Sequence, residues 1–530
     1  MVTTGNSLQK FPFLKKAAAP AFLFVLLLIQ VIFIINAPWV GDYWEHRAAL
    51  NELILHPANP SHPILLADKP HAFFSPYLVA LGWLGHYAHL SASQLLSLAA
   101  IGNLLLFVLS IRLLAGIFLP AGNRQLQVAA LMAAVLFCWG YDPPNFSSFY
   151  HAGTFFFTTP YPSTFSFTLS VLAAACFHYL MHHAVSVLWR LLLAAGIVLL
   201  LTTVLLTHPL TFLFGAALFA AIGLQAARCK TTSLFRITVS GLGFLILPFA
   251  LASFWPYYPF YELLGYVEPG NRFHADSREL YSSLYFKLFP LVLLVIFLVR
   301  KPGRFITSHL PLLFAMTLLA GLFFYGFFSG SYGLGRMIAF IALLAQVLLV
   351  KIAQEEGVRH HKLPFALLVL CCLPFVAVSL QQLAGAAFTT HRQYLKRPVH
   401  QPFDLTQPAE LAHRLQFIET KIPAGALVLT DTICARYLPG LGARIVATPF
   451  PLYWITDQEQ RLRDARIFFY SGTPARRDSL LQQYQPAFLL LTPTTRYLLP
   501  QLTQWTRGQR VYEENGLLLV PLNSSPQTNN

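Results

Sequence analysis

One apolar run follows another between residues 17 and 386, and this pattern constrains the fold more than any other feature. Hydrophobic residues make up 56% of the 530 residues and charged residues only 11%, which leaves too few charges to cover a soluble protein of this size. A helix that crosses a bilayer needs roughly 20 apolar residues, and its backbone groups must be hydrogen-bonded internally. The sequence therefore predicts a polytopic α-helical membrane protein.

About a dozen segments are candidates for membrane crossings. A segment at 126–140 is short, and one at 73–90 is weak because it carries Pro76, His86 and His89. We expect the weak segment to be embedded only in part on the outer face, which gives about 11 crossings, with about 13 as the alternative. The clearer segments are residues 17–36, 95–118, 164–182, 190–206, 208–227, 235–255, 285–299, 308–328, 335–351 and 363–386.

The distribution of Lys and Arg sets the expected orientation. The net charge of +15 lies largely in short loops, near Lys15, Arg228, Arg300 and Lys351, and such loops mark the cytoplasmic side. The charge therefore does not favour nucleic acid as a partner. We expect a bacterial inner (cytoplasmic) membrane protein that contacts membrane lipids, with its N-terminus in the cytoplasm and its C-terminal region outside. The first apolar segment reads as an anchor and not as a removed signal peptide.

The amino-acid composition changes near residue 390, where charged residues become frequent and long apolar runs stop. Short apolar strands alternate with helical patterns, which predicts a small extracytoplasmic α/β domain over 390–522, followed by a disordered tail at 523–530. The expected membrane domain covers 1–389, with outer loops at 37–94, 141–163, 255–284 and 329–335. The expected elements of the α/β domain are helices at 411–423, 457–467, 475–484 and 494–505, strands at 426–431, 443–450 and 487–492, and a hairpin of 510–514 with 516–522.

An acidic pair follows directly after the first apolar segment. Asp42 and Glu45 are three residues apart, so a helix would place them on one face. Two carboxylates beside a bilayer suit proton abstraction from a hydroxyl, or the binding of a cation. The alternative is structural: Asp42 caps a short helix, and Glu45 pairs with Arg47 or with solvent.

Basic and histidine side chains on the expected outer face are the other candidates. Lys69, Arg272 and Arg336 could each bind a phosphate, although Lys69 could equally anchor the chain at the membrane surface and Arg336 could extend to lipid headgroups. The histidines His46, His151 and His208 lie at or near the same expected face, and His208 precedes a proline, which favours a structural role. The outer-face histidines are scattered, so the sequence leaves open whether a divalent cation such as Mg²⁺ or Mn²⁺ binds.

The first outer loop resembles that of the GT-C superfamily of membrane glycosyltransferases. The resemblance lies in an acidic element just past the first span, GDYWEH at 41–46, and a Lys/His-Pro element before the next apolar stretch, DKPHAFFSPY at 68–77. The layout of 11 to 13 spans with an outer C-terminal α/β domain is also similar. Two departures leave the subfamily and the choice of base open: Asp42 and Glu45 are not adjacent, and His71 stands where a second proline is common.

The resemblance implies an enzyme that uses a sugar carried on a polyprenyl phosphate. It implies that Asp42 or Glu45 accepts a proton from a hydroxyl of a glycan, lipid or protein acceptor, in a single displacement that inverts the anomeric carbon. Lys69, Arg272 and Arg336 would stabilise the leaving phosphate. The alternative function is transport or lipid handling in the assembly of cell-envelope polysaccharides, which needs no carboxylate beside the first span.

Overall fold

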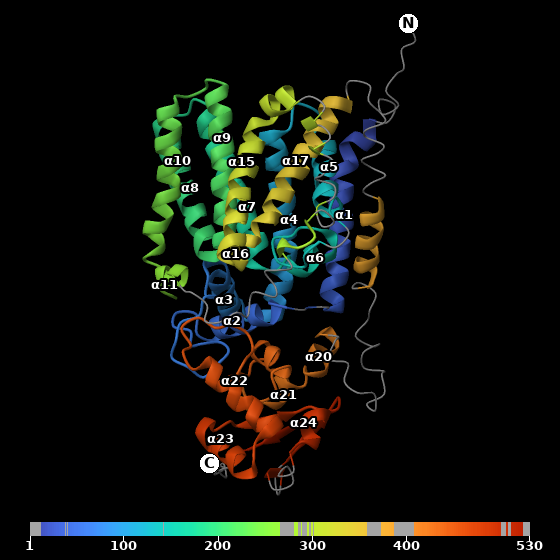
Figure 1. Ribbon diagram of the computed structural model, residues 1–530, viewed down its shortest axis with the longest axis vertical. Helices are drawn as coiled ribbons and strands as arrows, with labels where there is room; N and C mark the ends of the chain where they lie inside the picture. Colours follow the sequence, from blue (N-terminus) through green and yellow to red (C-terminus); the bar gives the residue numbers. More distant parts are fainter. Residues whose placement is uncertain are drawn as a thin grey trace. The chain divides into compact units, whose positions relative to one another are not determined.

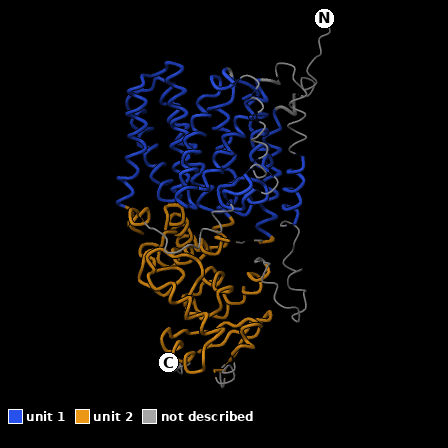
Figure 2. Tube along the Cα trace, in the orientation of Figure 1, with its two compact units in different colours: residues 1–35, 98–254, 267–387 blue, residues 36–97, 255–266, 388–530 orange. Residues whose placement is uncertain are grey.

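The computed structural model describes residues 12–37, 39, 41–140, 143–265, 280–284, 288, 294–295, 298–299, 302–357, 373–385, 408–499, 505–506 and 510–522. The chain divides into two compact units (Figures 1 and 2). The first unit comprises residues 1–35, 98–254 and 267–387, and the second comprises residues 36–97, 255–266 and 388–530. The loop after the first span is therefore grouped with the C-terminal region and not with the membrane helices that flank it.

The first unit is a bundle of apolar helices. Among the described residues, eight helices of the chain are long and apolar enough to cross a membrane, and they match eight of the predicted spans. The protein is an integral membrane protein. The helices of this unit are α1 (Pro12–Asn36), α4 (Ala92–Phe118, whose first residues are grouped with the second unit), α5 (Arg124–Phe137), α6 (Ala152–Thr158), α7 (Pro162–His182), α8 (Val187–Thr207), α9 (Pro209–Arg228), α10 (Leu234–Ala252), α15 (Pro302–Ser329), α16 (Tyr332–Gly335) and α17 (Met337–Gly357).

The remaining predicted spans are not settled by these helices. The segment 285–299 lies almost entirely outside the described residues, and of 363–386 only an apolar helix, Leu373–Gly385, is described. The short segment at 126–140 forms the 14-residue α5, and the weak segment at 73–90 forms the 13-residue α3 (Pro76–Ala88). Both are shorter than the roughly 20 residues that a crossing requires, so the number of crossings stays a prediction.

Local signals set where the membrane helices begin. The Ser186 and Ser233 side chains accept hydrogen bonds from the backbone N–H groups of Trp189 and Arg236, which satisfies donors at the starts of α8 and α10. Proline occupies the first position of α7 and of α9, where its missing N–H is not needed. These residues set where the helices begin, while the length of each apolar stretch sets how far the helix continues.

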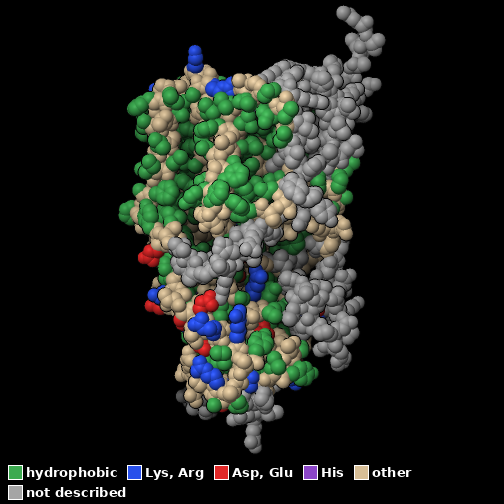
Figure 3. Space-filling model, viewed as in Figure 1, with side chains coloured by type: hydrophobic (Ala, Val, Ile, Leu, Met, Phe, Trp, Pro, Cys, Tyr) green, Lys and Arg blue, Asp and Glu red, His purple; other side chains and the backbone are tan. Residues whose placement is uncertain are grey.

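Helix α17 is the most enclosed helix of the bundle. In its apolar stretch 78% of the residues are buried, against 11% in α10 and 17% in α8, which expose their side chains. Phe340 of α17 stacks on Phe214 of α9 with ring centroids 4.7 Å apart. Hydrophobic side chains dominate the visible surface of these helices, as expected for a surface that lipid covers (Figure 3).

The second unit contains the predicted α/β domain. Its sheet has the strand order β2-β1-β3-β5-β4, with β1 parallel to β2 and β3, and β5 antiparallel to β3 and β4. All three predicted strands and the closing hairpin are present, although β2 covers only two of the residues expected at 443–450. The strands are β1 (Leu427–Leu429), β2 (Arg444–Ile445), β3 (Phe488–Leu491), β4 (Tyr512–Glu514) and β5 (Leu517–Pro521).

Two helix predictions in this domain are wrong in part. The helix expected over 411–423 is two pieces, α20 (Pro408–Arg414) and α21 (Ile418–Lys421), and the helix expected over 494–505 ends early, as α24 (Pro493–Tyr497). Short helices of this kind depend on tertiary packing more than on propensity, which is why periodicity overestimates them. The other elements are α22 (Gln458–Arg466), the π-helix η5 (Ile467–Ser471), α23 (Pro474–Tyr484), and the 3-10 helices η3 (Cys434–Arg436) and η4 (Leu438–Leu441).

The first outer loop folds as part of this second unit. It contributes α2 (Tyr43–Leu55) and α3, which pack together, and α2 also packs against η4. The Ile445 N–H of β2 donates to the Ile64 carbonyl at 2.9 Å, and Leu65 forms a parallel bridge with Ile445. The loop therefore extends the edge of the sheet, and Trp255 and α11 (Phe260–Gly265) complete the unit.

Candidate functional site

The acidic pair lies at the start of α2. Gly41, with a φ of +64°, turns the chain into the helix, Asp42 directly precedes the first helical residue, and Glu45 lies in the first turn. The His46 N–H donates to the Asp42 carbonyl at 3.0 Å, which closes this turn. Asp42 and Glu45 therefore lie at the N-cap and in the first turn of the same helix.

Glu45 is buried without a hydrogen-bond partner among the described residues. Its side chain is 3% exposed, and neither carboxylate oxygen has a hydrogen-bond partner among the described residues. Burial raises the pKa of the Glu45 carboxyl well above its ordinary value, the neighbouring charge of Asp42 raises it further, and Arg436 lowers it in part. This environment favours the protonated form of Glu45, whereas Asp42 is only half-buried.

The structural alternative for this pair does not describe what is seen. Asp42 occupies the N-cap position of α2, but its side chain makes no capping hydrogen bond to that helix. Arg47, the expected partner of Glu45, forms its ion pair with Glu419. Glu45 is therefore not paired as the structural alternative expects, and a buried carboxyl with a strongly shifted pKa is a candidate for a functional group.

Aromatic residues fix the position of this helical turn. Trp39 stacks on Tyr43 with centroids 4.9 Å apart, and Trp44 meets Tyr437 edge-on at 5.6 Å. Gly440 of η4 lies directly on Trp44, since a Cβ at this position would come within 2.8 Å of the Trp44 carbonyl oxygen. The C-terminal domain therefore contacts the backbone of the turn that carries the acidic pair.

Replacing Gly440 with Ala should shift the helical turn that carries Asp42 and Glu45, although neither acidic residue is changed. The added Cβ would meet backbone atoms, which cannot move aside cheaply, so we expect a loss of about 1–3 kcal/mol of stability. Thermal unfolding of the purified variant measures this loss. Gly265→Ala is the matched control, because a Cβ there meets nothing within 4 Å; equal effects of the two substitutions would contradict the contact.

An ion pair anchors α2 to the C-terminal domain. Arg444 of β2 donates to Glu52 at 2.5 Å, and both side chains are buried, at 10% and 6% exposed. Ser61 donates to Glu52 through its N–H and its hydroxyl, both at 2.8 Å, and accepts from Arg444 at 2.9 Å. Asn51 adds a hydrogen bond to the Gly440 carbonyl at 3.0 Å. These hydrogen bonds thus fix the C-terminal half of α2 against the C-terminal domain.

Three buried histidines belong to the same unit. Burial lowers the pKa of His46 and of His62 to about 3, and that of His71 well below its ordinary value, so all three rings are neutral. The His62 and His71 rings meet edge-on with centroids 4.9 Å apart, and His46 stacks on Phe73. Backbone N–H groups donate to Nδ1 of His62 and of His71, so the hydrogen of each neutral ring is on Nε2.

Lys69 and Arg436 supply positive charge in this unit. Lys69 is exposed, and the buried member of its Lys-Pro-His element is His71. Arg436, at the end of η3, is also exposed and interacts electrostatically with Glu45. Sequence reasoning missed Arg436 because about 390 residues separate it from the acidic pair and no motif marks it.

The other predicted site residues lie in the first unit. Arg336 donates to the carbonyl and the hydroxyl of Ser147 and lies 5.9 Å from the centre of the Tyr332 ring, so the second outer loop holds its guanidinium. His151 is buried and donates from Nε2 to the Pro144 carbonyl at 3.2 Å; burial lowers its pKa to about 4.

His208 and Arg272 complete the set. His208, at the start of α9, is hydrogen-bonded through Nδ1 to the Thr211 hydroxyl at 2.7 Å, which suits the structural role that the sequence favoured. Arg272 lies outside the described residues. The structure therefore groups Asp42, Glu45, His46 and Lys69 in one unit, and Arg336, His151 and His208 in the other.

Metal ligands do not converge in the described part of the chain. No group of three or more His, Cys, Asp or Glu side chains there is placed to hold an ion. The two Glu45 oxygens, which have no hydrogen-bond partner among the described residues, provide only part of a donor set. The residues in view thus do not form a cation site by themselves.

Comparison with known proteins identifies the fold. No family model and no curated protein matches the sequence. Among solved structures, ArnT from Cupriavidus metallidurans bound to undecaprenyl phosphate aligns with a TM-score of 0.52 and 13% identity, covering 96% of this chain and 99% of ArnT. The apo oligosaccharyltransferase of Archaeoglobus fulgidus aligns with a TM-score of 0.51 and 13% identity, covering 97% of this chain and 75% of that one. The chain has the GT-C fold.

The likeness to ArnT and to the oligosaccharyltransferase confirms the fold that the sequence predicted. A further structure of the Archaeoglobus protein, in complex with zinc and sulfate, aligns with a TM-score of 0.48.

Replacing Glu45 with Gln should make the folded protein more stable at neutral pH. The folded-state pKa of Glu45 is raised, so the stability linked to this group is complete below its unfolded value of about 4.3 and is lost as the pH rises. Gln carries no charge at any pH. We expect the variant to gain about 1–3 kcal/mol near neutrality, with the difference closing toward about pH 4.

Unfolding of the purified wild-type protein and the Glu45→Gln variant across this pH range measures the effect. Glu419→Gln is the control, because Glu419 forms an ion pair with Arg47 and should not gain stability on neutralisation. A Glu45 variant that is less stable than the wild type near pH 7 would show that the carboxylate is ionised and compensated in the folded protein.

Proposed function

We propose that the protein transfers a sugar from a polyprenyl-phosphate carrier to a hydroxyl acceptor on the outer face of the bacterial inner membrane. The observation that carries the proposal is the acidic pair directly after the first span, with Glu45 buried and without a hydrogen-bond partner among the described residues, on a GT-C fold. A nucleotide sugar is supplied in the cytoplasm, whereas a lipid carrier presents its phosphate and sugar at headgroup depth. The undecaprenyl phosphate bound to ArnT supports this class of carrier.

Asp42 is the better candidate for the base. A general base must be ionised at the working pH, and burial favours a proton on Glu45. Asp42 is half-buried, so solvent still stabilises its charge. A neutral Glu45 also spares Asp42 the repulsion of a second negative charge close by. Glu45 would then be a positioning residue that keeps a single negative charge at the start of α2.

The proposed reaction is one displacement. The acceptor hydroxyl gives its proton to the Asp42 carboxylate while its oxygen forms a bond to the anomeric carbon. The bond between that carbon and the phosphate oxygen breaks, and the electron pair leaves with the polyprenyl phosphate, which gains one negative charge. The anomeric centre is inverted, and the Asp42 proton then passes to solvent.

Positive charge is needed where the leaving phosphate gains its negative charge. Arg436 is our first candidate, because it already interacts with Glu45 and its side chain is exposed. Lys69 belongs to the same unit and could act as a point charge. Arg336 and Arg272 remain candidates from other outer loops. Whether a divalent cation such as Mg²⁺ or Mn²⁺ contributes stays open, and the steps above are assigned to the residues of this chain alone.

The proposal is tested with purified protein and labelled donors. We expect transfer from polyprenyl-phosphate sugars, with release of polyprenyl phosphate, and none from the corresponding nucleotide sugars. A panel of labelled hexoses and pentoses on the same carrier identifies the sugar. Turnover of nucleotide sugars, or release of sugar from none of the lipid carriers with any glycan, lipid or peptide acceptor, would contradict the proposal.

A further inference from the structure

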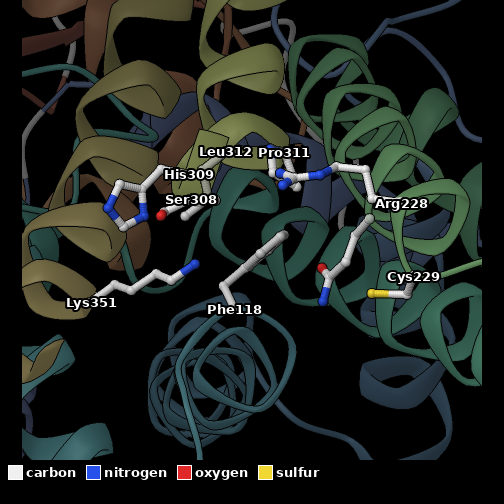
Figure 4. Close-up of a pocket in the computed structure, with 9 residues that line it drawn as sticks. Phe118, Arg228, Cys229, Ser308, His309, Pro311, Leu312 and Lys351 are labelled. Carbon is white, nitrogen blue, oxygen red and sulfur yellow. The ribbon is translucent and has the colours of Figure 1, made fainter. Parts of the chain in front are cut away.

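A pocket lies among the ends of four helices of the first unit (Figure 4). Its volume is about 290 Å³, which accommodates a headgroup-sized ligand and not a whole lipid. The walls come from the C-terminal parts of α4, α9 and α17 and from the N-terminal part of α15. The lining residues are Phe118, Gln225, Arg228, Cys229, Ser308, His309, Pro311, Leu312 and Lys351.

The polar lining is rich in hydrogen-bond donors. Lys351 and the Arg228 guanidinium enter the pocket from opposite sides (Figure 4). Arg228 donates from Nη1 to the Thr307 carbonyl at 2.6 Å, which fixes its orientation and leaves further guanidinium N–H groups. His309 is 5% exposed, and its Nδ1 has no hydrogen-bond partner among the described residues.

The charge of the lining is positive. Arg228 and Lys351 are the two charged residues that line it, and both are cations. Glu355 lies 3.9 Å from Nε2 of His309 and interacts electrostatically with Lys351, but its side chain is 40% exposed and does not line the pocket. Two cations that converge with a hydroxyl and an imidazole suit an anion with several acceptor oxygens, such as a phosphate group.

The remaining walls are apolar. Phe118, Pro311 and Leu312 lie beside the cations, and the helices that carry them are membrane-spanning candidates. Basic side chains also gather at one end of this unit in Figure 3, as expected for loops that face the anionic cytoplasmic leaflet. A basic recess between membrane helices, with an apolar wall, is the arrangement that recognises phospholipid headgroups.

We propose that this pocket binds the phosphate headgroup of an anionic phospholipid, at the opposite ends of the membrane helices from the outer loops. Arg228 and Lys351 hold the phosphate oxygens, His309 and Ser308 add hydrogen bonds, and Phe118 and Leu312 contact the start of the acyl chains. The bound lipid contacts α4, α9, α15 and α17 and so links these four helices at the pocket end of the first unit. The site does not depend on the proposed sugar transfer.

Lipid binding is measured on the purified full-length protein in a neutral detergent, by thermal unfolding during titration. The probes are phosphatidylglycerol, zwitterionic phosphatidylcholine and inorganic phosphate. We expect phosphatidylglycerol to raise the unfolding temperature, and phosphatidylcholine and inorganic phosphate to leave it nearly unchanged. Inorganic phosphate as effective as the lipid would assign the site to a free anion and overturn the proposal, as would equal stabilisation by phosphatidylcholine.

Variants locate the site. Arg228→Gln and Lys351→Gln should each require about tenfold more phosphatidylglycerol for the half-maximal shift, which corresponds to about 1.4 kcal/mol. Arg236→Gln is the matched control, because Arg236 is exposed at the start of the next helix and does not line the pocket. Arg228→Lys keeps the charge and should lose less than Arg228→Gln. Wild-type affinity in both Gln variants, or an equal loss in Arg236→Gln, would refute the assignment.

Discussion

Replacing Asp42 with Asn should lower the rate of sugar transfer about 10²–10⁴-fold, the usual contribution of a positioned general base. Asn has the same shape but cannot accept the proton of the acceptor hydroxyl. The substitution also removes a charge that raises the pKa of Glu45, so the fold should not be weakened. Turnover of a labelled polyprenyl-phosphate sugar by the purified variant measures the effect.

The control for this prediction is Asp68→Asn, an exposed carboxylate of the same unit. It should keep wild-type turnover. Equal turnover in the wild type and Asp42→Asn would remove Asp42 from the mechanism and favour a protein that binds or moves lipid-linked sugars. A loss in Glu45→Gln larger than that in Asp42→Asn would instead assign the base to Glu45.

Replacing Arg444 with Met should destabilise the second unit by about 3–5 kcal/mol, because it leaves the buried Glu52 carboxylate without its cation. Ser61 alone cannot compensate the charge of Glu52. Sugar transfer should fall as well, since Glu52 lies on the helix that begins with the acidic pair. Unfolding of the purified protein and the transfer rate are the two measurements.

A double variant separates the ion pair from its geometry. Glu52→Leu together with Arg444→Met removes both charges, so most of the lost stability should return. Arg496→Met is the surface control: its pair with Glu513 is 45% and 59% exposed and should contribute about 0–1 kcal/mol. Equal losses at Arg444 and Arg496 would show that burial does not strengthen the first pair.

Sequence patterns predicted the membrane bundle and the α/β domain because both depend on local composition. Apolar runs such as 164–182 need no partner to be read as helices, and strands such as β3 stand out between polar turns. The same reasoning overestimated the helix at 411–423, since the break between α20 and α21 depends on how both pieces pack.

The candidate site was predictable only in part. Asp42 and Glu45 could be found because they lie close together in the sequence and beside a span. The contributions of Arg436, Arg444 and Glu419 could not, because each comes from the C-terminal domain and reaches α2 only through the fold. No local sequence pattern predicts that the first outer loop belongs to the same compact unit as that domain.

The anomeric configuration of the product tests the proposed displacement most directly. Purified protein is given a polyprenyl-phosphate sugar of known configuration and an acceptor for a single turnover, and the configuration of the new glycosidic bond is determined by NMR. With Asp42 acting as a base, the sugar is never bonded to the protein, so the product should be fully inverted. A retained configuration would require a covalent sugar–carboxylate intermediate and would contradict the single displacement.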